Sequence, residues 1–290
     1  METPLKGGLG LVVDSVADLS ESILKELGNI KIVPFHIYFQ KENITYDDGV
    51  TLSYHDFYKK LEQPELGLPK TQGPNTAEYL AAYEEMLKKY DSLLSLHMSP
   101  KMSVAFNSAK LAREMLPNAD ITQWDSGSVS MVLGLYAIQA ARRAKEGMSA
   151  ARIVEKLDKF KQETVQLFVA DTLKYLRQSG RVNQVAYLIG QALHIKPIFT
   201  FKDGMGEPAG RELSQERAFL RIAKTMAEKF GQRPIVATVV HSMAPAQAEL
   251  LKQRITNNTN VQELIVAEMG PTLGAHGGAG VVGAAAFPVD

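Results

Sequence analysis

Leu9-Gly10-Leu11-Val12-Val13, followed at once by Asp14-Ser15, is the segment that decides the fold class. A short, branched, apolar run that ends in a polar turn is typical of a buried strand. Three later runs of the same character are predicted strands as well: residues 30–39, 93–98 and 121–124. The N-terminal half therefore contains four predicted strands, each followed by polar residues.

Helical patterns fill the intervals between these strands. Three helix starts are marked by a capping oxygen before an apolar-periodic segment, at Ser20, at Ser53 and at Asn75. A longer helix is predicted over residues 128–146, ending at Gly147. Strands and helices that alternate in this way predict an α/β fold, with a largely parallel sheet and helices on its faces.

The alternation of predicted strands and helices changes after about Gln162, and this change predicts a second structural unit. Its predicted strands are residues 165–170, 196–201, 235–241, 261–268 and 281–287, and its predicted helices are residues 172–179, 185–193, 214–230 and 245–254. We therefore expect an N-terminal α/β domain over residues 1–165 and a C-terminal mixed α/β domain over residues 166–290.

Composition and charge exclude several classes of function. The 290 residues include 32 basic and 32 acidic side chains, so the basic excess of a nucleic-acid-binding protein is missing. The absence of cysteine excludes disulfides, zinc–thiolate sites and thiol nucleophiles. No pair of histidines has metal-site spacing, and no apolar run is long enough to span a bilayer. A cytoplasmic protein without a metal or cofactor is expected.

Polar side chains follow the predicted parallel strands at their carboxyl ends, where open sheets of this kind bind ligands. They are Asp14, Ser15, Ser99, Ser103, Asp125 and Ser126. Ser103 also precedes a predicted helix that runs to Met115, and the start of a helix favours an anion. Thr71, in the predicted loop 68–75, offers another hydroxyl group. The sequence therefore predicts a polar site at this edge of the sheet.

The glycine-rich segment 270–280 is a second candidate part of the site. Gly278-Ala279-Gly280-Val281-Val282-Gly283 matches the dinucleotide-binding fingerprint, but that motif requires a following helix and only seven residues come after Gly283. The match is therefore interpreted as a false positive, and a nucleotide-binding regulatory module, a third hypothesis, rests on this match alone. The glycines do allow a ligand to approach the backbone closely, and His276 is the side chain of this segment that both donates and accepts protons.

Eight short motifs occur in an order and spacing that match a known family. They are Val13-Asp14-Ser15-Val16-Ala17-Asp18-Leu19, Tyr46-Asp47-Asp48-Gly49-Val50, Pro69-Lys70-Thr71, residues 99–109, Trp124-Asp125-Ser126, Leu173-Lys174-Tyr175-Leu176 with Gly180-Arg181-Val182, Ile195-Lys196-Pro197-Ile198, and Gly270-Pro271 with His276. With these motifs the chain resembles, nearly end to end, the bacterial DegV family, the fatty-acid-binding subunits of fatty acid kinase.

The resemblance implies a lipid-binding carrier without catalytic activity of its own. It implies that two α/β domains hold one long-chain fatty acid in a tunnel between them, with the carboxylate held by Thr71, Ser103 and His276. Arg181 and Arg211 match basic positions near the head group or in kinase docking. The kinase subunit is the implied partner that makes the acyl phosphate, and an acyltransferase at the membrane surface would receive it for phospholipid synthesis.

Three motifs depart from the usual family pattern. Thr-Ser-Gln-Pro is replaced by Thr71-Gln72-Gly73-Pro74, Ser-Gly-Thr by Ser103-Val104-Ala105, and His-Thr-Gly-Pro-Gly by His276-Gly277-Gly278-Ala279-Gly280. The first residue of each motif is kept. The expected carboxylate contacts are therefore retained, while their neighbours differ.

Physical chemistry supports such an arrangement. Each buried methylene contributes about 0.8 kcal/mol, so a dozen contribute on the order of 10 kcal/mol before ordering costs. A desolvated carboxylate needs hydrogen bonds, and uncharged donors supply them. A bidentate arginine would stabilise the unreacted carboxylate more strongly and so would not assist phosphoryl transfer to it.

An enzyme uses the same residue types and is the alternative hypothesis. Ser103 would be the nucleophile, His276 the base and Asp14 or Asp125 the orienting carboxylate of a lipid esterase or acyltransferase. No Gly-x-Ser-x-Gly nucleophile elbow occurs in the chain, which argues against this hypothesis.

Overall fold

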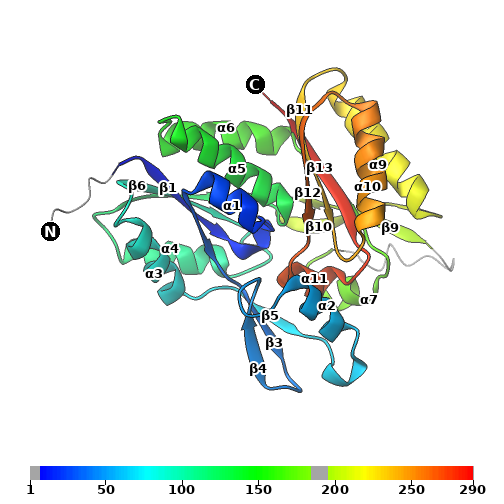
Figure 1. Cartoon of the computed structure of the whole chain (residues 1–290), viewed down its shortest axis with the longest axis horizontal. Helices are drawn as coiled ribbons and strands as arrows, with labels where there is room; N and C mark the ends of the chain where they lie inside the picture. The colour runs from blue at the N-terminus through cyan, green and yellow to red at the C-terminus, as the bar shows by residue number, and fades with distance from the viewer. Residues whose placement is uncertain (1–6, 184–194, 290) are drawn as a thin grey trace.

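The computed structural model describes residues 7–183 and 195–289. In this part of the chain the strands form three sheets: a four-stranded sheet, a six-stranded sheet and a small three-stranded sheet. Figure 1 shows the two larger sheets side by side, with the small sheet below them. The α/β fold predicted from the sequence is confirmed, with a parallel sheet in the N-terminal half and a mixed sheet in the C-terminal half.

The four-stranded sheet is parallel throughout. Its order is β2 (Ile30–Val33), β1 (Leu9–Asp14), β6 (Ser92–His97) and β7 (Asp120–Asp125). Helices α3 (Thr76–Met86) and α4 (Ala105–Glu114) cover one face, and α5 (Met131–Lys145) and α6 (Ala150–Glu163) cover the other (Figure 1). β1 is buried at every position, which agrees with its continuous apolar sequence.

The predicted capping residues begin three helices. Ser20 and Ser53 accept backbone hydrogen bonds at the starts of α1 (Glu21–Leu27) and α2 (Tyr54–Leu61). Asn75 and Glu78 form a reciprocal capping box at the start of α3. Two short 3₁₀ turns complete this half: η1 (Ser15–Ala17) and η2 (Pro64–Leu66).

The prediction of one strand over residues 30–39 was wrong. Pro34 separates β2 from β3 (His36–Phe39), and the two strands belong to different sheets. Proline has no backbone N–H, so it cannot continue a strand inside a hydrogen-bonded ladder. β3 pairs antiparallel with β4 (Ile44–Asp47) and with β5 (Lys70–Gln72), neither of which was predicted. β5 lies in the segment 68–75 that was expected to be a loop.

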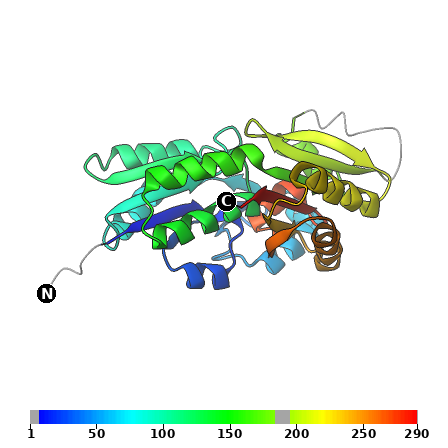
Figure 2. The ribbon, with the colours of Figure 1, turned by 90° about the horizontal axis from the view of Figure 1, so that it is seen from above.

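The six-stranded sheet is mixed. Its order is β10 (Met205–Glu212), β9 (Lys196–Lys202), β8 (Val165–Val169), β13 (Val282–Pro288), β11 (Ile235–His241) and β12 (Val261–Glu268). β13 lies between β8 and β11 and is antiparallel to both. Helices α9 (Gln215–Phe230) and α10 (Pro245–Asn258) cover its outer face, and α5 and α6 lie on its inner face, as Figure 2 shows from above.

Contacts between α5, α6 and this sheet join the two halves of the chain. The Phe287 ring of β13 stacks on Tyr136 of α5 and on Phe160 of α6, with centroid distances of 5.4 and 4.6 Å. Arg142 of α5 donates two hydrogen bonds to Glu263 of β12, of 2.6 and 2.8 Å. One hydrophobic core therefore runs across residue 165, and the division of the chain there stays a prediction.

Four other elements differ from the prediction. The segment 270–280, expected to be a loop, contains helix α11 (Pro271–Gly277). The predicted helix over residues 172–179 is shorter, as α7 (Lys174–Ser179). α6 and β10 were not predicted. The predicted helix over residues 185–193 lies outside the described residues.

Candidate functional site

A cavity of about 440 Å³ lies where the three sheets meet. Its walls come from β5, from the loop between β6 and α4, from α11 and from strands β8 and β9. Most of the lining is apolar, and it includes Phe35, Met98, Met102, Phe168, Phe199 and Val281. The volume lies within the range of small-molecule sites, about 300–1,000 Å³.

Thr71, Ser103 and His276, three residues predicted from separate parts of the sequence, all line this cavity. Thr71 comes from β5, Ser103 from the turn before α4, and His276 from the last turn of α11. The Thr71 Oγ1 atom lies 2.8 Å from His276 Nε2, within hydrogen-bond distance. An apolar cavity with a few convergent polar groups is the usual form of a ligand site.

Local packing explains how these residues meet. Thr71 lies opposite Ile37 in the small sheet, and the Tyr58 hydroxyl of α2 donates a 2.9 Å hydrogen bond to the Met269 carbonyl just before α11. A Cβ on Gly73 would lie 2.7 Å from Ser103 Oγ, so a larger residue at this position would require the Ser103 hydroxyl to move. The departure from the family motif at this position thus fits the local packing.

The His276 imidazole is uncharged at neutral pH. Burial lowers its pKa from 6.5 to about 4, and the nearby charge of Arg181 lowers it further in the same direction. A neutral imidazole has one N–H donor and one acceptor nitrogen, so Nε2 either donates to the Thr71 hydroxyl or accepts from it. When Nε2 donates, the Thr71 proton is free for a ligand.

Ser103 also has a proton to offer. Its Oγ accepts a 3.2 Å hydrogen bond from the Ala105 backbone N–H, and in the described part of the chain it donates none. Helix α4 begins at Ala105 rather than at Ser103, with Val104 as an exposed capping position. Val104 also lines the cavity at this point.

The two predicted basic residues lie in different places. Arg181 lines the cavity with an exposed side chain, and its guanidinium donates a 2.6 Å hydrogen bond to the Ser179 carbonyl. Arg211 is exposed on β10, opposite Pro197 of β9, and is not among the cavity-lining residues. The structure therefore brings Arg181, but not Arg211, to the cavity.

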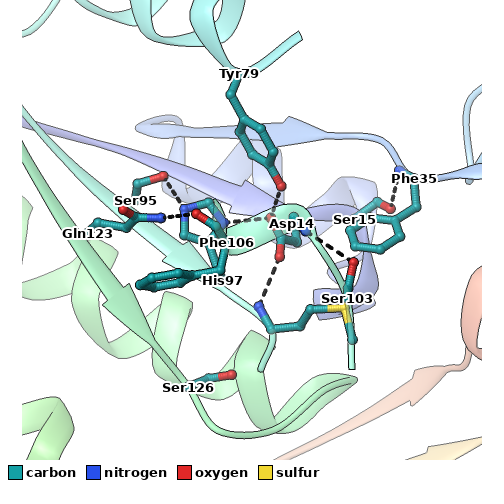
Figure 3. A network of polar contacts seen from close by, with 12 residues as sticks. Asp14, Ser15, Phe35, Tyr79, Ser95, His97, Ser103, Phe106, Gln123 and Ser126 are labelled. Carbon is teal, nitrogen blue, oxygen red and sulfur yellow. Dashed lines mark hydrogen bonds and ion pairs between the residues drawn. The ribbon is translucent and has the colours of Figure 1, made fainter. Parts of the chain in front are cut away.

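Asp14, predicted as a supporting residue, does not line the cavity and lies at the centre of a buried polar network (Figure 3). Its carboxylate accepts hydrogen bonds from the Tyr79 hydroxyl at 2.6 Å, from His97 Nδ1 at 2.9 Å and from the Met98 backbone N–H at 2.9 Å. Met98 lines the cavity and begins the loop that leads to Ser103. Asp14 thus fixes the start of that loop without itself lining the cavity.

Ser95 and His97 are part of the same network and were not singled out from the sequence. Ser95 Oγ lies 2.7 Å from His97 Nε2, so Ser95, His97 and Asp14 are connected in the order of a hydrolase relay (Figure 3). All three side chains are 0% exposed, and a substrate has no access to them. Their spacing on β6 is the signal for this network, because residues two apart share one face of a strand.

The other supporting residues hold turns outside the cavity lining. Ser15 Oγ donates a 3.0 Å hydrogen bond to Asp48 and accepts one from the Phe35 backbone. Asp125 accepts from the Gly127 backbone at 2.7 Å, and Ser126 donates to the Ser128 carbonyl at 3.1 Å.

The relay required by the esterase hypothesis is not formed. His276 Nε2 pairs with Thr71, and the imidazole paired with Asp14 is that of His97. Over residues 7–183 and 195–289 no hydrogen bond joins Ser103 to His276. The segment 278–283 leads into β13 and not into a helix, so it also lacks the context of a dinucleotide site.

No group of three or more His, Asp or Glu side chains among the residues that the structure describes is arranged to hold a metal ion. Among the described helices, none combines the length and the apolar character needed to cross a membrane.

Comparisons with known proteins give one consistent result. A family model described as an uncharacterised protein of the DegV family matches residues 9–289. A DegV domain-containing protein of Halalkalibacterium halodurans is 32% identical over 277 residues, covering 95% of this chain and 96% of that protein. Protein DegV of Bacillus subtilis is 29% identical over 277 residues, covering 95% and 97%.

Solved structures of similar proteins share the whole fold. A DegV family protein from Thermus thermophilus, described by its fatty acid binding, superposes with a TM-score of 0.91 at 27% identity, over 97% of this chain and 100% of that one. DegV from Bacillus subtilis, described as a fatty acid binding protein, gives a TM-score of 0.86 at 27% identity, over 97% and 99%. The family model and these full-length matches agree with the resemblance in the sequence motifs, and the chain belongs to the DegV family.

Proposed function

We propose that this protein binds one long-chain fatty acid in the cavity, with the carboxylate at Thr71, Ser103 and His276 and the acyl chain against the apolar walls. The observation that carries the proposal is the convergence of these three uncharged polar side chains at one apolar cavity. The similar proteins from Thermus thermophilus and Bacillus subtilis are both described as fatty acid binding, which supports it.

The size of the cavity supports a long acyl chain. A water-sized group occupies about 30 Å³, so a cavity of about 440 Å³ holds roughly 15 such groups. At about 0.8 kcal/mol for each buried methylene, a chain of this length contributes on the order of 10 kcal/mol before ordering costs. The acyl chain therefore supplies most of the affinity.

The head-group chemistry supports a carboxylate. A desolvated carboxylate requires hydrogen-bond donors, and the Ser103 hydroxyl and the Thr71 hydroxyl provide two of them. In the tautomer with the proton on Nε2, the neutral His276 ring donates to the Thr71 oxygen and so directs the Thr71 proton toward the ligand. Because these donors are uncharged, they leave the carboxylate reactive toward phosphorylation.

The wider role is that of a carrier without catalytic activity of its own, a cytoplasmic partner of an ATP-dependent kinase. It would present the carboxylate to the kinase subunit, which makes the acyl phosphate, and would then deliver this product to a membrane-associated acyltransferase. Arg181, exposed at the cavity, and Arg211, exposed on the edge strand β10, are the proposed head-group or kinase-docking cations.

Mass spectrometry of the protein purified under native conditions tests the binding proposal. We expect one fatty acid per chain, and we expect delipidated protein to take up labelled hexadecanoate. Delipidated protein that takes up no label at any ratio would contradict the proposal. A serine-directed covalent probe is the matched test of the esterase alternative, which predicts an adduct on Ser103.

The docking role has its own test. Arg181→Ala and Arg211→Ala should reduce phosphorylation by a cognate kinase subunit more than they reduce lipid retention, because both side chains are exposed. The opposite pattern, lost lipid with unchanged phosphorylation, would contradict the docking role.

A further inference from the structure

Asp18 is a buried carboxyl group that joins two segments of the cavity wall. It follows the turn η1 at the end of β1 and is 3% exposed. Its Oδ1 accepts a 3.0 Å hydrogen bond from the Gly270 backbone N–H, and its Oδ2 accepts a 2.6 Å hydrogen bond from the Ser130 hydroxyl. One side chain thus bonds to segments that are distant in the sequence.

Both of these segments belong to the cavity. Gly270 directly precedes α11, the helix that carries His276 and Thr272 into the cavity wall. Ser130 directly precedes α5 and itself lines the cavity. The Asp18 carboxyl group therefore links the start of α11 to the start of α5.

The backbone at this connection is strained. Ser130 has φ 60° and ψ −159°, a region that glycine alone adopts readily. Asp18 itself is left-handed, with φ 53° and ψ 34°. Such conformations persist where the surroundings hold them in place, and they concentrate at functional sites. Here two strained residues are hydrogen-bonded to each other beside the proposed ligand site.

We propose that Asp18 is a positioning residue for the head-group site: by joining Gly270 to Ser130, its carboxyl group sets where α11 holds His276. This inference rests on the proposed function only for its effect on binding. The role is indirect, because Asp18 is not among the residues that line the cavity.

Burial makes the protonated form of Asp18 the stable one. It raises the pKa of Asp18 to about 8, although the hydrogen bonds from Ser130 and Gly270 lower this pKa, and the negative charges of Asp48 and Glu268 raise it further. Tyr54 and Tyr58 of α2 also face the carboxyl group, and their own pKa values are raised by burial and by the charge of Asp18. At the start of α5 the facing group is the Ser130 hydroxyl. Ionisation of Asp18 therefore places a charge in an acidic, desolvated pocket.

The carboxylate still accepts both hydrogen bonds, but repulsion of its desolvated charge by Asp48 and Glu268 should displace the segment before α11 and loosen the connection at alkaline pH. If only the protonated form holds α11 in the binding position, the apparent affinity falls with the protonated fraction. One pH unit above a pKa of about 8, that fraction is about one tenth, so affinity at pH 9 should be roughly 10-fold lower than at low pH.

Affinity for dodecanoate, measured from pH 6.5 to pH 9, tests the proposal. Wild type should lose roughly 10-fold in affinity over this range, whereas Asp18→Asn, which is neutral and has the same shape, should keep its affinity throughout. Asp120→Asn, a change at an exposed carboxylate on β7, is the matched control and should follow the wild-type profile. A flat wild-type profile, or an equal fall in Asp18→Asn, would overturn the positioning role.

A second readout needs no lipid and separates this inference from the proposed function. The NMR signal of the His276 ring should shift with a midpoint near pH 8 in wild type and stay constant in Asp18→Asn. If dodecanoate does not bind but this shift is present, the proposed function is wrong and the positioning role holds. If the shift is absent, the positioning role is wrong whether or not dodecanoate binds.

Discussion

Replacing Thr71 by valine removes one hydroxyl group from the head-group site and keeps the shape of the side chain. In wild type the Thr71 oxygen lies 2.8 Å from His276 Nε2, and the imidazole is uncharged because its pKa is lowered to about 4. The carboxylate of a bound fatty acid accepts the Thr71 proton when Nε2–H donates to the same oxygen. Valine removes both bonds at once.

The size of the effect follows from the kind of bond lost. A hydrogen bond to a charged group contributes about 1.5–3 kcal/mol. At about 1.4 kcal/mol for each factor of ten, the affinity of Thr71→Val for a fatty acid should fall by roughly 10- to 150-fold. The free energy of unfolding of the unliganded protein should fall by only about 1 kcal/mol, the typical value for one lost internal hydrogen bond.

Isothermal titration of delipidated protein at pH 7.5 measures this effect directly. Dodecanoate and dodecanol have the same chain, so the comparison separates the head group from the acyl chain. Thr71→Val should lower the affinity for dodecanoate much more than the affinity for dodecanol. Thr71→Ser should keep most of the wild-type affinity because it retains the hydroxyl group. Equal weakening of both ligands, or a dodecanoate affinity within about twofold of wild type, would refute the assigned head-group contact.

Three other changes have defined outcomes. Gly73→Ala places a Cβ 2.7 Å from Ser103 Oγ, so it should displace this hydroxyl and weaken fatty-acid affinity about tenfold with little change in melting temperature; unchanged affinity in titration would contradict the contact. The pKa of Asp18, raised from 3.8 to about 8, means that the folded state keeps a proton which the unfolded state loses, so stability should fall by about 1.4 kcal/mol per pH unit as pH rises through this range. When the free energy of unfolding in urea is measured at several pH values, it should fall less steeply with pH in Asp18→Asn than in wild type. The same pH dependence in both proteins would contradict a raised pKa of Asp18. Gly283→Ala places a Cβ 2.2 Å from the Phe168 ring, which lines the cavity, so it should destabilise the fold by about 1–3 kcal/mol and reduce uptake of the longest fatty acids relative to shorter ones; equal uptake of all lengths would disagree.

Local signals in the sequence predicted the elements that depend on local physics. The capping oxygens of Ser20, Ser53 and Asn75 begin helices as expected, since a cap and its partners lie within a few residues. The apolar runs of β1 and β11 are strands for the same reason. These features require no knowledge of the rest of the chain.

Features that depend on distant partners were not predictable in this way. Helix α11 was expected to be a loop because its glycines disfavour a helix, and the contact with Tyr58 of α2 that supports its start lies more than 200 positions away in the sequence. The small sheet depends on Pro34, which separates two strands that looked like one. The buried network of Asp14 and His97 joins β1 to β6, and only the tertiary fold brings them together.

The candidate site likewise has features that the sequence predicted and features that only the tertiary fold shows. Residue types and strand ends indicated a polar edge, but the family resemblance selected Thr71, Ser103 and His276 from among many hydroxyls and histidines. Their meeting at one cavity depends on three elements whose contacts no local pattern encodes. Asp18 belongs to the motif Val13–Leu19 of the family resemblance, yet only the tertiary fold brings it to Gly270.

The position of β13 has a consequence for how the protein is made. Because β13 lies between β8 and β11, these two earlier strands do not pair with each other, and each lacks its β13 partner while the chain emerges from the ribosome. Their open edges must be kept from wrong pairing until the last strand of this sheet is translated, and such non-local closure is slow. Since Val281, the residue before β13, contributes to the cavity wall beside Phe168 of β8, this part of the wall is completed only when synthesis has passed this strand.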